Sequence, residues 1–166
     1  MAFLRHFLMI EDNYKQRGLR NKLVKLLRSK GILEERLLAA IGKVPRHVFF
    51  DDALLNHAYE DKAFPIGEGQ TISQPYIVAR MTEALLQGGV SRKVLEVGTG
   101  SGFQAAAMSS LASRVISVDR WNELVVAARG RFGTARLMRT FAFLGDGFEG
   151  WADDAPYDRI VINGTM

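Results

Sequence analysis

The stretch VLEVGTGSGFQAAAM, residues 94–108, decides the interpretation of the whole sequence. A short apolar run leads into an alanine-rich segment that favours a helix, and between them stand three alternate glycines, Gly98, Gly100 and Gly102. A strand, a glycine loop and a helix in this order are typical of sites where backbone approaches a nucleotide-like ligand closely. The dinucleotide pattern G-x-G-x-x-G would need glycine at position 103, where phenylalanine stands, and no Gly-Lys-Ser/Thr of a phosphate-binding loop follows.

The sequence after residue 93 alternates between predicted strands and predicted helices. Strands are expected at residues 93–98, 114–119, 138–146 and 157–164, and helices at residues 104–111 and 123–131. This alternation predicts an α/β fold with a doubly wound, mainly parallel sheet and right-handed crossovers. Ligands of such sheets bind outside the carboxyl ends of the strands, so polar residues that follow the apolar runs are candidates for a site.

Three carboxylates stand near successive strand ends: Glu96, Asp119 and Asp146. A fixed carboxylate at Glu96 would repel a pyrophosphate but attract an ammonium or a sulfonium, and S-adenosylmethionine carries both cations and no phosphate. Asp119 has the position expected of a residue that accepts hydrogen bonds from two ribose hydroxyls, and Asp146 with Gly147 could contact the adenine edge. Each residue also has an ordinary alternative: a strand-end charge at Glu96, a helix N-cap at Asp119, and a turn at Asp146 and Gly147. Their joint occurrence at successive strand ends favours the cofactor.

The first 62 residues predict a helical cap. Helices are expected at residues 17–31, 34–44 and 51–61, the last with capping aspartates at its start. The first helix is predicted to place an apolar stripe on one face and the basic residues of RGLRNKLVKLLRSKG on the other. We interpret this basic face as solvated, with a nucleic-acid or anionic-lipid surface as the alternative, because no aromatic residues are interleaved with the charges. Residues 64–74 have the composition of a loop, and Pro75 begins a helix that Gly88 and Gly89 end.

Composition restricts the organisation of the chain. With 166 residues, 48% of them hydrophobic, we expect a single domain, residues 1–166, with the cap at 1–62 and a cofactor-binding α/β part at 63–166. There is no cysteine, and the histidines are scattered, so no metal site is expected. The apolar start, MAFLRHFLMI, is too short to span a bilayer and lacks a cleavage site. We therefore expect a cytoplasmic protein without a membrane partner.

Several segments, in order, resemble those of bacterial protein-L-isoaspartate O-methyltransferase. They are PIGEGQTISQPYIVARMTEAL, VLEVGTGSGFQAA, SVDR, GDGFEGW and APYDRIV, and VPRHVFFDDALLNHAYED resembles the N-terminal cap of that family. The likeness covers residues 17–162. It implies a Rossmann-like methyltransferase domain that transfers the methyl group of S-adenosylmethionine to the free α-carboxylate of L-isoaspartyl residues in damaged proteins, which begins their repair. The expected partners are isoaspartyl-containing proteins and peptides, and no nucleic acid is expected.

The same resemblance implies roles for particular residues. Ser73 would be the active-site residue, and Gln70, Thr71 and Ile72 would line its pocket. The cofactor would be held by Glu96, Gly98, Gly100, Gly102, Asp119, Asp146 and Gly147. A carboxylate acceptor with an ordinary pKa of about 4 is already ionised at neutral pH, so catalysis depends on alignment and removal of water rather than on a general base. The alternative for TISQP is a loop that only caps the helix at Pro75.

The family's chain normally continues beyond the strand that resembles RIVING, so we expect the C-terminal strands of the sheet to be missing here. An open edge at residues 157–164 would favour a homo-oligomer. The alternative hypothesis for function is a catalytically impaired S-adenosylmethionine-binding or assembly module that uses this edge for a partner. A methyltransferase with another substrate, nucleic acid included, is disfavoured because no N/D-P-P-Y/F motif follows the fourth strand.

Overall fold

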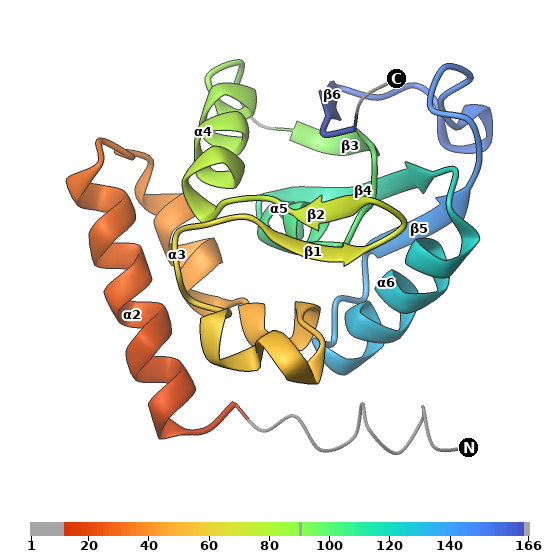
Figure 1. Cartoon of the computed structure of the whole chain (residues 1–166). Coiled ribbons are helices and arrows are strands. Elements are labelled where there is room, and N and C mark those ends of the chain that lie inside the picture. Colours follow the sequence, from red (N-terminus) through yellow and green to blue (C-terminus); the bar gives the residue numbers. More distant parts are fainter. Residues whose placement is uncertain (1–11, 90, 165–166) are drawn as a thin grey trace.

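A parallel sheet with the strand order β5-β4-β3-β6 forms the centre of the structure, a computed structural model that describes residues 12–89 and 91–164 (Figure 1). Its strands are β3 (Ser91–Val97), β4 (Ala112–Asp119), β5 (Thr140–Leu144) and β6 (Arg159–Ile162). The crossover helices are α5 (Phe103–Met108), between β3 and β4, and α6 (Asn122–Thr134), between β4 and β5. The predicted α/β class, the strands and the alternation are therefore confirmed. The apolar start at residues 1–10 lies outside the described residues.

The strand order reverses at β3, which places a crevice at its carboxyl end. Chain order leads outward from β3 through β4 to β5, whereas β6 pairs with the opposite side of β3. Val97, the last residue of β3, lies in register with Val118 on one side and with Ile162 on the other. Parallel α/β sheets bind ligands at such a reversal point, because the loops from the two sides diverge there and leave room between them.

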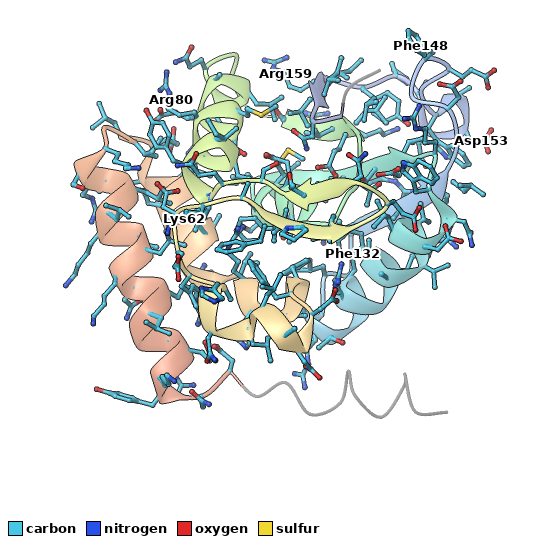
Figure 2. All side chains as sticks on the ribbon, in the orientation of Figure 1. Lys62, Arg80, Phe132, Phe148, Asp153 and Arg159 are labelled. Carbon is cyan, nitrogen blue, oxygen red and sulfur yellow. The ribbon has the colours of Figure 1, made fainter. Side chains whose placement is uncertain are left out.

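The sheet is covered differently on its two faces. On one face, Val94, Val115 and Val161 belong to a large apolar core that also includes residues of the helices and of the cap. On the other face, Leu95 and Ile116 belong to a smaller core, and aromatic residues that include Phe143, Trp151 and Tyr157 pack against it. Figure 2 shows side chains filling the space between the cap and the sheet. The large core therefore fixes the cap against the ligand-binding half of the fold.

Within residues 12–62, the cap contains two α-helices and two short 3-10 helices. They are α2 (Tyr14–Ser29), α3 (Glu35–Lys43), η1 (Arg46–Phe49) and η2 (Asp52–His57). The first two predictions are confirmed, but the third segment forms 3-10 turns, and Asp51 at its start makes no capping hydrogen bond with its side chain. Arg20 also departs from the predicted basic face. It is buried between α2 and α3, where its Nε donates to the carbonyl of Gly42 at 2.8 Å and its guanidinium pairs with Asp12 at 2.9 Å.

Residues 64–72 form a β-hairpin, so the loop predicted at residues 64–74 is wrong for most of this segment. Strand β1 (Phe64–Gly67) pairs antiparallel with β2 (Gln70–Ile72), and Gly67, Glu68 and Gly69 make the turn with positive φ angles. Ile72 is buried in the large core and holds the hairpin against the domain. A tertiary contact of this kind cannot be predicted from the local sequence, which is short and polar. Helix α4 (Pro75–Leu86) begins at Pro75 as predicted. In Figure 1 the hairpin passes in front of the sheet.

No helix within residues 12–89 and 91–164 combines the length and the apolarity that crossing a membrane requires.

Candidate active site

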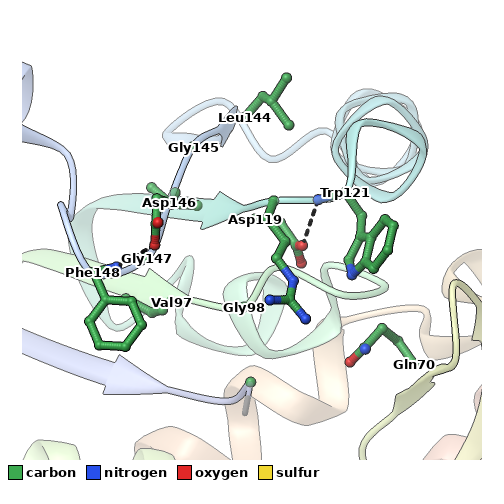
Figure 3. Close-up of a pocket in the computed structure, with 13 residues that line it drawn as sticks. Gln70, Val97, Gly98, Asp119, Trp121, Leu144, Gly145, Asp146, Gly147 and Phe148 are labelled. Atoms are coloured by element: carbon green, nitrogen blue, oxygen red, sulfur yellow. Dashed lines mark hydrogen bonds between the residues drawn. The ribbon is translucent and has the colours of Figure 1, made fainter. Parts of the chain in front are cut away.

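A cavity of about 440 Å³ opens at the carboxyl ends of β3, β4 and β5 (Figure 3). Its walls come from the last residues of the three strands, from the loops that follow them, and from the tip of the hairpin. Its lining residues include Gln70, Val97, Gly98, Asp119, Arg120, Trp121, Leu144, Asp146, Gly147, Phe148 and Gly164. The volume lies in the range of pockets that hold cofactor-sized molecules.

A second, smaller cavity of about 50 Å³ lies between the hairpin and the glycine loop. Thr71 and Ser73 line it from the hairpin side, and Thr99 and Gly100 line it from the loop side. The two cavities share four lining residues, Gln70, Gly98, Asp119 and Gly164. Most of the residues predicted to face the acceptor or to hold the cofactor therefore line these two adjoining cavities, but Ile72, Glu96 and Gly102 do not.

Asp119 lies where the two cavities meet and is 8% exposed. Its Oδ2 accepts a hydrogen bond from the Gly100 backbone N–H at 2.9 Å, and its Oδ1 accepts one from the Trp121 N–H at 3.1 Å (Figure 3). The N-cap of α6 is Trp121, so Asp119 does not serve as the helix cap that the sequence offered as an alternative. Because a carboxylate has about four acceptor sites, Asp119 retains capacity for hydroxyl donors of a ligand.

Asp146 and Gly147 line the large cavity at the end of β5. The Oδ1 of Asp146 accepts a hydrogen bond from the Phe148 N–H at 2.9 Å, which makes a local turn. Asp146 therefore forms the turn that was one interpretation of this segment, and it also faces the cavity, which was the other. Gly147 packs tightly on β3, because a Cβ added there would lie 2.3 Å from Cγ1 of Val97.

Gly98 brings the glycine loop against the end of β6. Its φ of +94° favours glycine, and an added Cβ would lie 2.7 Å from the backbone nitrogen of Gly164. Gly100 lines the small cavity, and its N–H is held by Asp119. Gly102 lines neither cavity. It is the N-cap of α5 and packs against Phe132, so the structure gives it a role in positioning the loop.

Glu96 is fully buried behind the loop and lines neither cavity. One carboxyl oxygen lies 2.5 Å from Oγ of Ser117, the other accepts from Nδ2 of Asn163 at 2.6 Å, and Ser117 in turn contacts Thr99 at 2.7 Å. Burial raises the pKa of Glu96 to about 8, against the effect of these two hydrogen bonds. The side chain is therefore mainly protonated at neutral pH in the ligand-free protein. Its observed contacts tie β3, β4, the glycine loop and β6 together.

The predicted acceptor residues divide into two groups. Gln70, Thr71 and Ser73 line the small cavity, whereas Ile72 points into the core and is 1% exposed. The alternation of side chains along a strand explains why Thr71 and Ser73 face the cavity while Ile72 between them does not, but Gln70, the first residue of β2 beside the turn, does not follow it. Among the described residues, the Ser73 hydroxyl makes no hydrogen bond.

Helix α4 is capped by a residue from the cap region, not by TISQP. Gln74, at the N-cap position, makes no capping hydrogen bond with its side chain, and the carboxylate of Asp61 accepts from the Tyr76 N–H at 2.8 Å. The capping alternative for Ser73 is therefore not what the structure shows, and its hydroxyl is available to the cavity.

Sequence reasoning missed several residues of the large cavity. Trp121 and Phe148 supply aromatic surface, Arg120 supplies a cation, and Leu144 supplies apolar surface. Each lies within three residues of a predicted ligand-binding aspartate, so the strand-end rule could have found them if it had been applied to whole loops. The described residues contain no group of three or more His, Cys, Asp or Glu side chains that could hold a metal ion.

The fold and the site together define an α/β domain of the Rossmann-like class with a nucleotide-type cavity at the reversal point of its sheet. The sequence model of the family described as protein-L-isoaspartate(D-aspartate) O-methyltransferase matches residues 18–165. A relative of that name from Halorhodospira halophila is 53% identical over 143 residues, which cover 86% of this chain and 65% of the relative. Another from Cytophaga hutchinsonii is 49% identical over 152 residues, covering 92% of this chain and 68% of the relative. The chain belongs to the protein-L-isoaspartate(D-aspartate) O-methyltransferase family.

Solved structures agree with this fold. A structure described as protein-L-isoaspartate O-methyltransferase matches with a TM-score of 0.75 and 28% identity, over 86% of this chain and 47% of that one. A Plasmodium falciparum structure, described as a beta-aspartate methyltransferase in complex with S-adenosyl-L-homocysteine, matches with a TM-score of 0.72 and 18% identity, over 86% and 72% of the two chains. The chain spans about two thirds of the length of the curated relatives that it matches.

Proposed function

We propose that this chain binds S-adenosylmethionine in the large cavity and transfers its methyl group to the α-carboxylate of L-isoaspartyl residues. The observation that carries the proposal is the junction of the two cavities, where Ser73 and Thr71 lie across from the glycine loop and Asp119. Family membership gives the type of reaction, and the junction gives a place where donor and acceptor can meet.

The residues at the large cavity fit the proposed cofactor. Gly98 and Gly147 allow close approach of backbone, Asp119 can accept hydrogen bonds from ribose hydroxyls, and Trp121 and Phe148 provide apolar surface for a purine. The structure of similar fold from Plasmodium falciparum, which holds S-adenosyl-L-homocysteine, supports the same assignment. When bound, the cofactor supplies a methyl group made electrophilic by its sulfonium. We propose that Glu96, Gly100, Gly102 and Asp146 support this binding by shaping the loops around it.

The residues at the small cavity fit a carboxylate acceptor. The hydroxyls of Ser73 and Thr71 can donate hydrogen bonds that orient a carboxylate without neutralising it, while Gln70 can contact both cavities. No residue needs to remove a proton from the acceptor, since a carboxyl group of ordinary pKa is ionised at neutral pH. These side chains would therefore act by orienting the acceptor and excluding water from its attacking oxygen.

A second candidate function is an S-adenosylmethionine-binding or assembly module. The observation that favours it is β6, which is an edge strand of the described sheet and leaves Ile160 and Ile162 about half exposed. We propose on the same ground that the chain can form a homo-oligomer through this edge, which its molecular mass in solution would test. We also propose a cytoplasmic location, where a protein without cysteine loses nothing from reducing conditions.

The deciding experiment uses labelled S-adenosylmethionine and two peptides that differ only in an isoaspartyl or a normal aspartyl residue. Base-labile label on the isoaspartyl peptide alone is the expected result. Calorimetric binding of the cofactor without transfer to either peptide would refute the enzyme and favour the binding module. Equal labelling of both peptides would refute the proposed acceptor while leaving a methyltransferase.

A further inference from the structure

Arg46 is a buried cation that connects the cap to the hairpin segment carrying Ser73. It is 1% exposed, and its guanidinium carbon lies 4.3 Å from the ring centre of Phe103 and 5.2 Å from that of Phe50. Its Nε donates to the carbonyl of Ala58 at 2.9 Å, and its Nη2 donates to the carbonyl of Ser73 at 3.1 Å. The planar guanidinium thus bridges the end of η2 and the backbone of Ser73 with two donors of fixed relative position.

Asp61 holds the next residues of the same segment from the same side. Its carboxylate accepts from the Tyr76 backbone N–H at 2.8 Å and from Nε2 of Gln74 at 3.2 Å, and it pairs with Lys30 at 2.5 Å. Burial alone would raise the pKa of Asp61, but these hydrogen bonds keep it below its usual value. The segment from Ser73 to Tyr76 is therefore fixed at its first residue by Arg46 and at its second and fourth by Asp61.

The two charges also stabilise each other. Burial lowers the pKa of Arg46 to about 9, and the negative charge of Asp61 opposes this shift. Burying a guanidinium among apolar and aromatic groups costs free energy that hydrogen bonds offset only in part here, because Nε and Nη2 donate to main-chain carbonyls while Nη1 has no partner among the described residues. A hydrophobic side chain could fill the same volume without fixing the backbone of Ser73.

We propose that Arg46, assisted by Asp61, is a positioning residue that sets where the Ser73 hydroxyl lies in the small cavity. Arg46 lines neither cavity itself, but it contacts two residues that line the small cavity, Ser73 through its carbonyl and Phe103 through its ring. This inference rests on the proposed function of Ser73, but its structural half can be tested without activity.

A matched set of buried arginines makes the test specific. Arg20 is buried in the cap and donates to the carbonyl of Gly42 in α3, not to the segment that carries Ser73 or to the glycine loop. Arg131 is buried and donates from Nη1 to the carbonyl of Ser101, in the glycine loop, at 3.2 Å. Replacing Arg20, Arg46 or Arg131 by methionine removes the same charge and similar hydrogen-bond donors in each case. The three substitutions differ in the backbone segment that loses its hydrogen bond.

The first readout is backbone hydrogen exchange of residues 70–76, measured by mass spectrometry on the full chain. We expect Arg46→Met to accelerate exchange in this segment, and Arg20→Met and Arg131→Met to leave it near the wild-type rate. Arg46→Lys, which keeps the charge but cannot reproduce the two-donor fork, should give an intermediate rate. Unchanged exchange in Arg46→Met, or wild-type exchange in Arg46→Lys, would overturn the proposal whether or not the chain is an enzyme.

The second readout compares the effect of each substitution on methyl transfer to the acceptor peptide with its effect on cofactor affinity. With the isoaspartyl peptide, Arg46→Met should lower kcat/KM by about tenfold to hundredfold, with the Kd for S-adenosylmethionine unchanged, whereas Arg131→Met should impair cofactor binding and transfer together. If Arg46→Met does not fold, the same measurements are made on Arg46→Lys and Asp61→Asn and compared with the wild type. An equal loss in Arg20→Met would show that general destabilisation causes the effect and would refute positioning. Absence of transfer in the wild type would refute the proposed function, while the exchange result would still decide the role of Arg46.

Discussion

Replacing Glu96 by glutamine should make the protein more stable than wild type by an amount that grows as pH rises. The carboxyl is fully buried, and its pKa is raised from 4.5 to about 8. Between these values the folded protein keeps a proton that the unfolded chain has lost, so unfolding releases it. The stability due to the protonated form is thus fully present below pH 4.5 and is lost as pH rises through about 8.

The size of the effect follows from the proton count. One proton released on unfolding changes the free energy of unfolding by about 1.4 kcal/mol per pH unit, or at most about 2.7 kcal/mol between pH 5.5 and 7.5. Glutamine matches the protonated carboxyl, since its Nε2 can donate to Oγ of Ser117 and its Oε1 can accept from Nδ2 of Asn163. The wild type should lose stability relative to Glu96→Gln across this window, and histidine titration cancels in the difference.

The measurement is urea unfolding of both proteins at pH 5.5, 6.5 and 7.5, with free energies from linear extrapolation. Glu83→Gln is the control of opposite sign. Burial alone would raise the pKa of Glu83, but hydrogen bonds from the backbone N–H groups of Leu33 and Glu34 and from Arg80 hold it below its usual value. Its replacement should destabilise the protein by a nearly constant amount across the window. A difference between Glu96→Gln and wild type that does not change with pH would refute the reasoning, because Glu96 would then be ionised at pH 5.5 or accessible to water.

Three further substitutions test the site. Ser73→Ala should lower methyl transfer to the isoaspartyl peptide by about tenfold to hundredfold with the cofactor Kd unchanged, and a parallel loss of both would contradict the separate roles. Asp119→Ala should weaken cofactor binding by about tenfold to hundredfold, from the loss of charge-assisted hydrogen bonds, and unchanged calorimetric affinity would exclude the ribose contact. Gly98→Ala should destabilise the chain by about 2 kcal/mol or more, because its φ is +94° and the new Cβ would meet the backbone of Gly164. Gly18→Ala, in α2 with no atom within 4 Å of an added Cβ, should instead stabilise it by about 0.5–1 kcal/mol; thermal melts compare the two.

The strand-end residues could be predicted because sequence order alone places them. Asp119, Asp146 and Gly147 follow apolar runs of a parallel sheet, and carboxyl ends of such strands share one edge. All three line the large cavity. The rule works without knowledge of packing, since it depends only on where each strand ends.

The burial of Glu96 required more than strand order. It lies inside β3, a central strand with neighbours on both sides, in register with Ser117 of β4 and Val161 of β6. A parallel strand covered on both faces buries each of its side chains, so a carboxylate there faces core rather than ligand. The apolar residues on both sides of Glu96 in the run VLEV indicate such a buried strand. The position of Glu96 next to the glycines suggested a ligand contact instead.

The supports of the acceptor segment could not be predicted, because they join distant parts of the chain. Arg46 bonds to Ser73 across 27 positions, and Asp61 bonds to Tyr76 across 15. Neither residue shows a helical or strand period that would mark it as part of a site. The same is true of Arg20, which the helical pattern placed on a solvated face but whose donors reach Gly42 in the next helix.

The two sides of the site are therefore held by different parts of the fold. The sheet fixes the glycine loop, through Asp119 and through the close approach of Gly98 to Gly164. The cap fixes the acceptor segment, through Arg46. Gln70 of the hairpin lines both cavities, but the other lining residues of the large cavity come from the sheet strands and the loops that follow them. Loosening the cap should accordingly impair transfer more than cofactor binding, whereas loosening the glycine loop should impair both, because an acceptor can react only where the donor is held.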